Sequence, residues 1–193
     1  MSYHIYTTDG IILKRTGFGE ANILLHILTS DFGLIMASAR SARLSSSKLR
    51  GSLQEYASIS VSCIKGKNGW KITNVIDKGS LYFDYPKSTH KVLAQISAVL
   101  LQMIQGESPN KEIFKLVQSG FEFLKTTEEN LETFEILMML RILFELGYVA
   151  KGSETEVFLK DNSEWNKELF QKITLNKKPI VGLINKALKE SHL

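Results

Sequence analysis

The residues of this sequence that best suggest a chemical role are cationic, and they gather in two segments. The first segment, residues 39–51, sets basic residues among small Ser and Ala side chains: Arg40, Arg43, Lys48 and Arg50. The second segment surrounds an aromatic residue and consists of Lys65, Lys67, Trp70 and Lys71. Long cationic side chains with little bulk around them can lie along phosphate oxygens. Both segments are therefore candidate phosphate-binding loops.

Each segment also has a simpler interpretation. The first could be an ordinary solvated loop with no ligand. In the second, the Trp70 ring could stack on a nucleic-acid base while the lysines hold the backbone. The same ring could instead pack inside a barrel opposite Ile72, and the sequence leaves both alternatives open.

Catalytic motifs are missing from this sequence. It has no Walker loop, no Gly-x-Gly-x-x-Gly, no Gly-x-Ser-x-Gly and no His-Glu-x-x-His. The four histidines show no metal-ligand spacing: His4, His26, His90 and His192. The one cysteine, Cys63, continues the alternation of Ile59 and Val61, which favours a small buried residue over a reactive thiol. We expect no enzyme, no metal site and no cofactor.

The net charge of +4 is unevenly spread along the chain. Residues 1–80 hold ten Lys or Arg against five Asp or Glu, whereas residues 81–193 hold fourteen against fifteen. A local positive field of this kind favours a polyanion. The first eighty residues are therefore the part of the chain in which we expect a nucleic acid to bind.

Five short β-rich segments with turn signals occupy those eighty residues. They are residues 10–13, 23–28, 34–39, 53–64 and 70–76, and the Asn68-Gly69 pair predicts a tight hairpin before the last of them. Five strands in this length are typical of the oligonucleotide-binding (OB) fold, a small Greek-key barrel.

Beyond residue 81 the apolar residues recur at three- and four-residue steps, which predicts helices. The patterns cover residues 92–104, 113–124 and 134–146, and a last helix follows Pro179, while residues 150–178 show no clear pattern. The fold class is therefore α+β, with an OB-fold barrel at 1–80 and a helical domain at 81–193. The run 134–146 carries three charges and is shorter than a bilayer span, so we expect a core helix, no membrane contact and a cytoplasmic location.

Several stretches resemble one known family, and they follow in that family's order. They are Gly10-Ile11-Ile12-Leu13-Lys14-Arg15 with Gly19-Glu20-Ala21-Asn22-Ile23-Leu24, the turn from Thr29 to Gly33, Lys48-Leu49-Arg50-Gly51-Ser52-Leu53-Gln54-Glu55-Tyr56, and the segment from Phe134 to Tyr148. These stretches resemble the RecO family of recombination mediators. The resemblance implies an N-terminal OB domain, a helical domain and a DNA-binding activity that anneals complementary strands and helps a recombinase replace single-strand-binding protein. It also implies RecR and the acidic C-terminal tail of single-strand-binding protein as partners.

Three departures from that family's pattern bear on function. Leu44 and Ser46 fall on positions that the family usually keeps basic, so DNA affinity is expected to be lower. Relatives often carry four zinc-binding cysteines where this chain has Lys151-Gly152-Ser153, so we expect no zinc. Glu132 and Thr133 stand where relatives often carry arginine, which leaves tail binding at that position in question.

The sequence thus predicts a nucleoid-associated mediator of recombinational DNA repair that binds single- and double-stranded DNA. Its phosphate contacts would come from the two basic segments. The alternative is an OB-fold adaptor that binds proteins and has no direct role on DNA.

Overall fold

The computed structural model describes residues 4–47, 49–67, 69–80, 82–153, 155–161 and 164–191. The chain forms two compact units. The first contains residues up to Tyr85 together with Ile104–Phe114, and the second contains Pro86–Met103 and the residues from Lys115 onward. The fold class is α+β, as predicted.

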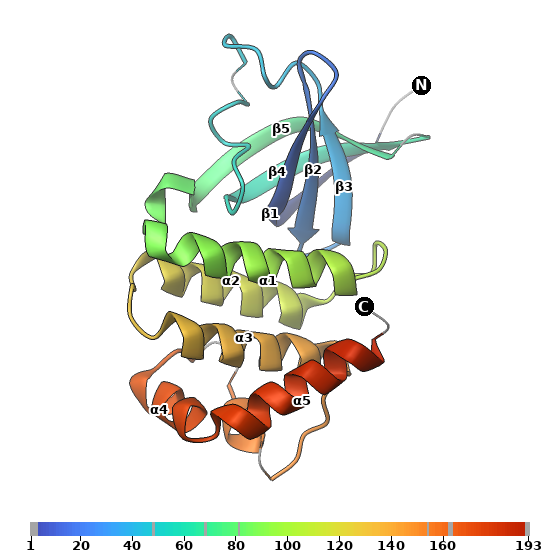
Figure 1. The fold of residues 1–193 in the computed structure, drawn as a ribbon. Coiled ribbons are helices and arrows are strands. Elements are labelled where there is room, and N and C mark those ends of the chain that lie inside the picture. Colours follow the sequence, from blue (N-terminus) through green and yellow to red (C-terminus); the bar gives the residue numbers. More distant parts are fainter. Residues whose placement is uncertain are drawn as a thin grey trace. The chain divides into compact units, whose positions relative to one another are not determined.

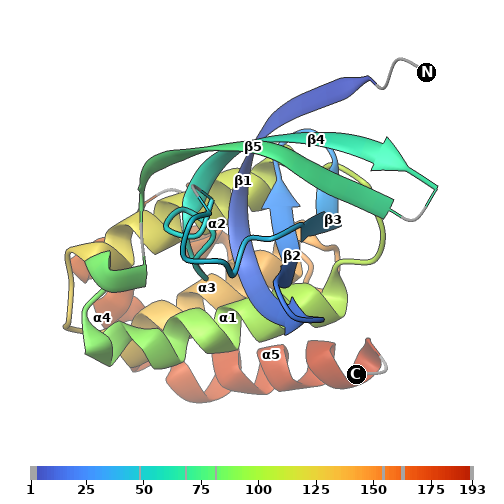
Figure 2. The same cartoon turned by 90° about the horizontal axis from the view of Figure 1, so that it is seen from above.

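Five strands form a closed barrel in the first unit (Figure 1). They are β1 (Ile5–Phe18), β2 (Asn22–Thr29), β3 (Gly33–Ala39), β4 (Ser58–Gly66) and β5 (Gly69–Ser80). Their order around the barrel is β1-β2-β3-β5-β4, with β3 and β5 parallel and the other pairs antiparallel. This is the five-stranded OB-fold barrel that the sequence predicted, and Figure 2 shows β4 and β5 as one long hairpin.

Strand alternation decides which side chains fill the barrel. Ile23, Leu25 and Ile27 of β2 point inward and are fully buried, and Ile35, Ala37 and Ala39 of β3 do the same. On β1 the register shifts between Ile12 and Lys14, because Leu13 is an extra residue in a β-bulge. Ile12 pairs with Ile27, and Lys14 pairs with His26. The residues between the inward ones point outward.

The first unit extends past the boundary that we predicted at residue 80. Tyr82 stacks on Tyr56 at 6.1 Å between ring centroids, and the Tyr85 hydroxyl donates to the Tyr56 carbonyl. The segment 104–114 also packs on the barrel, where the backbone of Ser108 lies so close to Gly33 that a Cβ there would come within 2.3 Å of the Ser108 oxygen. Because these contacts join residues distant in sequence, composition could not locate the boundary.

The second unit is helical and contains α1 (His90–Met103), most of α2 (Lys111–Lys125), α3 (Leu131–Glu145), α4 (Lys167–Leu175) and α5 (Lys177–Glu190). Single 3-10 turns occur at η1 (Tyr82–Asp84) in the first unit and at η2 (Lys87–Thr89) and η3 (Glu156–Phe158) in the second. Helix α3 packs against α1, α4 and α5 and is buried on several sides (Figure 1). The sequence predicted four of these helices and missed α4, where Asn166 caps the helix by accepting from the Leu169 amide. No helix within the described residues has the length and apolarity to cross a membrane.

A buried arginine on α3 organises the stretch that the sequence left without a pattern. The Arg141 side chain is fully buried, its Nε donates to the Phe158 carbonyl, and its Nη1 donates to the Glu164 carbonyl, both at 2.9 Å. Its guanidinium also lies 4.6 Å from the centre of the Trp165 ring. Burial lowers the pKa of Arg141 to about 10, and the carboxylates of Asp161 and Glu164 oppose that shift. The arginine stays charged and holds the chain on both sides of residues 162 and 163.

Candidate nucleic-acid interface

Residues 40–57, here called the basic loop, form a series of tight turns between β3 and β4. Backbone hydrogen bonds link Leu44 to Ser41, Ser47 to Leu44 and Arg50 to Ser47, each three residues apart. The side chains of Ala42, Leu53 and Ala57 are fully buried in the barrel core, and Leu49 packs against it. The loop is therefore anchored to the barrel along its length.

The anchoring leaves the cations of the basic loop on the outside. Arg40, Arg43 and Arg50 are exposed, and Lys48 lies outside the described residues. The Arg43 amide donates to Ala21 at 2.9 Å and its Nη1 donates to Gly19 at 3.2 Å, which ties the loop to the turn between β1 and β2. A guanidinium carries five N–H donors, so after this one hydrogen bond Arg43 still has donors that can bind a phosphate.

Residues 65–71, here called the basic hairpin, divide their lysines between two sides of the sheet. Lys71 pairs with Ser38 of β3 and therefore shares its outward side, while its neighbour Trp70 pairs with Ala37 and points inward. Lys65 pairs with Trp70 across the hairpin, and its Nζ lies 5.1 Å from the centre of the Trp70 ring. Of the predicted lysines, Lys71 joins the outward side, Lys67 is exposed near the turn, and Lys65 lies on the inward side.

Trp70 is buried, and its proposed role as a stacking platform is wrong. The residue is 4% exposed and contacts the rings of Tyr6 and Phe32 at 5.5 and 5.2 Å between centroids. Its Nε1 donates to Glu107 Oε1 at 2.8 Å, and the other carboxylate oxygen of Glu107 accepts from Lys65. Those two hydrogen bonds hold the pKa of Glu107 below its usual value, Lys65 having the larger effect. The alternative of packing inside the barrel is the one that the structure shows.

The outward side of β1, β2 and β3 carries residues that the sequence analysis did not single out as a site. Strand pairing places them in two rows, which we call the outer face: Lys14, His26 and Met36 in one, and Thr16, Leu24 and Ser38 in the other. Phe18 follows Thr16 on the same side of β1, and Arg40 follows Ser38 just beyond β3. One signal in the sequence could have indicated this outward side. It is the alternation along β3 of Ile35, Ala37 and Ala39 with Met36, Ser38 and Arg40.

His26 of the outer face is half-buried and its Nδ1 has no hydrogen-bond partner within the described residues. Burial lowers the pKa of His26, and the positive charge of Lys14 lowers it further. The imidazole is therefore neutral near pH 7, so the positive charge of the outer face comes from Lys14, with Arg40 and Lys71 beside it.

The described residues bring together no group of three His, Cys, Asp or Glu side chains suited to a metal. Cys63 is buried in β4 at 2% exposure, and this burial raises the pKa of its thiol to about 12. A thiol of this pKa is protonated at neutral pH, in agreement with the predicted role as a small buried residue.

Comparisons with known proteins agree on one family. Residues 1–76 match the family described as Recombination protein O N terminal, and residues 91–153 match Recombination protein O C terminal. The chain belongs to the recombination protein O family. It is 28% identical over 150 residues to the DNA repair protein RecO of Chlorobium limicola, covering 75% of this chain and 56% of that protein. It is 34% identical over 133 residues to the DNA repair protein RecO of Dehalococcoides mccartyi, covering 65% of this chain and 50% of that protein. The chain thus spans about half the length of the curated relatives it matches.

The N-terminal match lies in the barrel unit, and the C-terminal match lies mainly in the helical unit but includes residues 104–114 of the barrel unit. The helical unit carries a polar site at the start of α3. Glu132 forms an ion pair with Lys177 of α5 at 2.6 Å, and the Thr133 hydroxyl donates to the Asn130 carbonyl. The Glu132 side chain is 74% exposed, so its carboxylate would meet any acidic segment that approached this helix. Glu132 therefore places a carboxylate on the surface of the helical unit, whereas Thr133 is buried.

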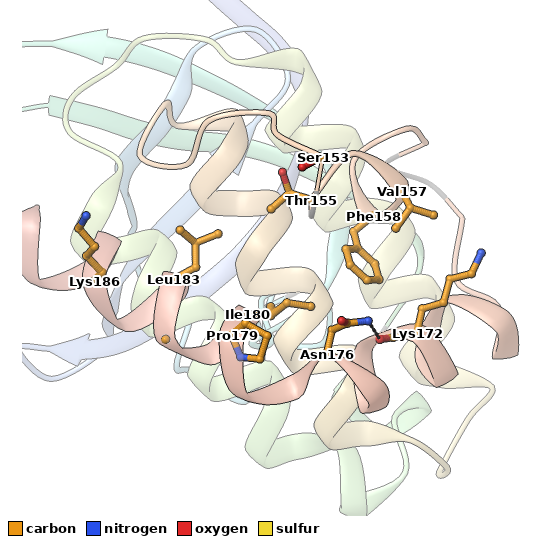
Figure 3. Close-up of a pocket in the computed structure, with 11 residues that line it drawn as sticks. Ser153, Thr155, Val157, Phe158, Lys172, Asn176, Pro179, Ile180, Leu183 and Lys186 are labelled. Atoms are coloured by element: carbon orange, nitrogen blue, oxygen red, sulfur yellow. Dashed lines mark hydrogen bonds between the residues drawn. The ribbon is translucent and has the colours of Figure 1, made fainter.

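A hollow in the helical unit lies between α5 and the segment 153–158, with a volume of about 570 Å³ (Figure 3). Phe158, Ile180 and Leu183 give it an apolar lining, and Lys172 and Lys186 stand at its two ends. The described lining residues include no carboxylate and no imidazole, so they offer no acid–base pair.

Proposed function

We propose that this protein binds DNA without sequence preference and acts in recombinational DNA repair by binding and not by catalysis. The membership of the recombination protein O family supports a role in repair. The observation that carries the proposal is the anchored basic loop, which holds Arg40, Arg43 and Arg50 exposed. Lys71 faces outward beside Ser38, two residues before Arg40. Cations presented in this way contact phosphates, which every DNA sequence has.

Strand annealing is the activity that this arrangement supports best. Two complementary single strands repel each other through their phosphates. Bound Lys and Arg side chains neutralise those phosphates, and the release of condensed counterions favours that binding. Because the basic loop directs its contacts to the backbone, the bases stay available for pairing. A protein that acts in this way would work on the bacterial nucleoid in the cytoplasm and would help load a recombinase onto DNA coated with single-strand-binding protein.

Partner binding belongs to the same proposal. A RecR-like protein is the proposed partner. The acidic tail of single-strand-binding protein is proposed to contact the chain away from Glu132, because that carboxylate is exposed and would repel it.

The experiment that tests the proposal is the titration of labelled single- and double-stranded oligonucleotides with the full chain at several salt concentrations. Each phosphate contact is expected to add roughly 0.7 to 0.9 to the slope of log affinity against log salt. A steep slope with no preference among sequences supports the proposal. No binding, or binding that salt does not weaken, would favour the alternative of an OB-fold adaptor for proteins.

A further inference from the structure

A groove in the helical unit runs between α1 and α5, and α3 forms its floor. Both outer helices pack against α3, which lies between them (Figure 1). The groove has a volume of about 560 Å³, and its lining is mostly apolar. Several of the apolar side chains that line it stay partly exposed in the folded chain, so the three helices leave apolar surface uncovered there: Val99, Ile136, Val181 and Leu188.

Hydrogen-bond acceptors without a donor interrupt this apolar lining. Oε1 of Gln95 is buried and has no hydrogen-bond partner within the described residues. The half-buried carboxylate of Glu135 lies on α3, and the described residues give it neither a hydrogen bond nor an ion pair. Burial raises the pKa of Glu135, the charge of Lys91 opposes that shift, and the charge of Glu132 adds to it. Lys177 is the cation among the described lining residues, and it is already paired with Glu132 at 2.6 Å.

From this combination we infer that the groove binds a basic amphipathic segment of a partner protein, with apolar side chains in the groove and a lysine or arginine beside Glu135 and Gln95. A half-buried acceptor without a donor costs free energy, and a cationic donor from outside would remove that cost. Grooves between helices commonly take such segments, whose apolar anchors recur on one face. The inference goes beyond the proposed DNA binding, because it uses none of the residues of the basic loop.

Charge distinguishes this groove from the hollow shown in Figure 3. That hollow has Lys172 and Lys186 at its ends, and its described lining residues include no carboxylate. The groove instead carries the carboxylates of Glu132 and Glu135, with Lys177 as the one cation among its described lining residues. An acidic segment or a phosphate backbone would be repelled by those carboxylates, whereas a basic segment would be attracted. The groove therefore selects a partner of positive charge.

A displayed library of random peptides, selected on the full chain, tests the inference. Ala98→Arg is the blocked variant, because Ala98 is an exposed lining residue of α1 and arginine is nearly as favourable in a helix. Ala94→Arg is the matched control, because Ala94 is exposed one turn earlier, lies outside the described lining, and its side chain leans toward the start of the helix. Peptides that combine apolar residues with lysine or arginine are expected to bind the parent and Ala94→Arg, and to bind Ala98→Arg at least about tenfold more weakly. If no selected peptide depends on the groove in this way, or if the dependent peptides are acidic, the inference is overturned.

A second pair of variants tests the contact with the partner's cation. Glu135→Gln keeps the shape and an acceptor but removes the charge, so a selected basic peptide is expected to bind about tenfold more weakly. Glu145→Gln is the matched control, since Glu145 is also half-buried on α3 but lies outside the described lining of the groove. The slope of log DNA affinity against log salt should be the same in all four variants, so this result is independent of the proposed DNA binding. Equal peptide affinity in Glu135→Gln and the parent would overturn the inference.

Discussion

The basic loop and the basic hairpin have similar compositions, yet the fold uses their cations differently. In the loop, buried Ala42 and Leu53 anchor the chain and leave Arg40, Arg43 and Arg50 exposed. In the hairpin, strand alternation turns Lys71 outward and places Lys65 on the side of Trp70, where Lys65 lies over the ring and pairs with Glu107 although 53% of its side chain is exposed. The difference teaches that the number of charges in a segment does not determine how many phosphates it can contact, because the direction of each side chain also determines this.

The largest effect that follows from this difference is on stability. Trp70→Ala is expected to lower the free energy of unfolding by about 3 to 5 kcal/mol, since it removes a large side chain that is 4% exposed in the core. Thermal or denaturant unfolding of the full chain measures it. Trp70→Phe, which removes the hydrogen bond to Glu107 but keeps an aromatic ring, is the control and should cost less. A Trp70→Ala protein as stable as its parent would show that the ring is not part of the core.

The next effect concerns the segment that covers the inward side of the hairpin. Gly33 has φ +68°, and its Cα faces the backbone of Ser108 so closely that Gly33→Ala must displace residues 104–110. We expect a loss of more than about 1 to 2 kcal/mol, because the left-handed conformation alone costs that much. Gly69→Ala is the matched control: its φ is +92°, but the nearest atom, the Met36 oxygen, is 3.9 Å away. Equal losses in the two variants would mean that the contact with Ser108 does not hold the segment.

A smaller effect is expected when the charge on Lys65 is released. Glu107→Gln keeps an acceptor for Trp70 and removes the ion pair, and the cost should be at most about 1 kcal/mol because both partners are well exposed. Because the pKa of Glu107 is lowered, the stability difference between the variant and the parent is fully present above the ordinary pKa of a carboxyl group. It disappears as pH falls through the lowered pKa. The slope of log DNA affinity against log salt should stay unchanged. A slope steeper by roughly 0.7 to 0.9 would show that free Lys65 contacts phosphate after all.

The smallest effect is a pH dependence at His26. Its pKa is lowered, so the unfolded chain binds the proton more readily, and the stability due to the neutral imidazole is lost as pH falls below about 6.5 toward the lowered value. Protonation of the folded protein also adds a positive charge to the outer face, so DNA affinity should rise as pH falls through the lowered pKa. His26→Gln should lack both changes. Unfolding and oligonucleotide titrations between pH 7 and pH 5 measure both changes. Identical pH profiles for the parent and the variant would show that protonation of His26 causes neither change.

Much of the fold could be predicted because its signals are local. The turn before Gly69, the alternation along β3 and the three- and four-residue steps of the helices each reflect neighbours in sequence, and the family resemblance agreed with them. Helix α4 was missed because its apolar residues are few and the chain before it is held by Arg141, whose partners lie 17 and 23 residues away.

The sequence predicted which segments of the candidate site are basic, but not the direction in which each side chain points. The exposure of Arg40, Arg43 and Arg50 follows from a loop rich in small polar residues, as expected. The burial of Trp70 depends on Glu107, 37 residues away, and on Phe32, so no local signal could settle it. Phe18 and Met36 were overlooked because a single exposed apolar residue in a strand is ordinary until strand pairing places it beside cations.

The most direct test of the account is the combined change Arg40→Ala, Arg43→Ala, Lys48→Ala and Arg50→Ala in the full chain. Arg40, Arg43 and Arg50 are exposed, and the loss of an exposed charge usually alters stability by less than about 0.5 kcal/mol, so the variant should unfold close to the parent's midpoint. Each lost phosphate contact should flatten the slope of log affinity against log salt by roughly 0.7 to 0.9, and strand annealing should slow accordingly. A variant that unfolds like the parent and also binds and anneals DNA with the parent's salt slope would contradict the assignment of the basic loop as the phosphate-binding site.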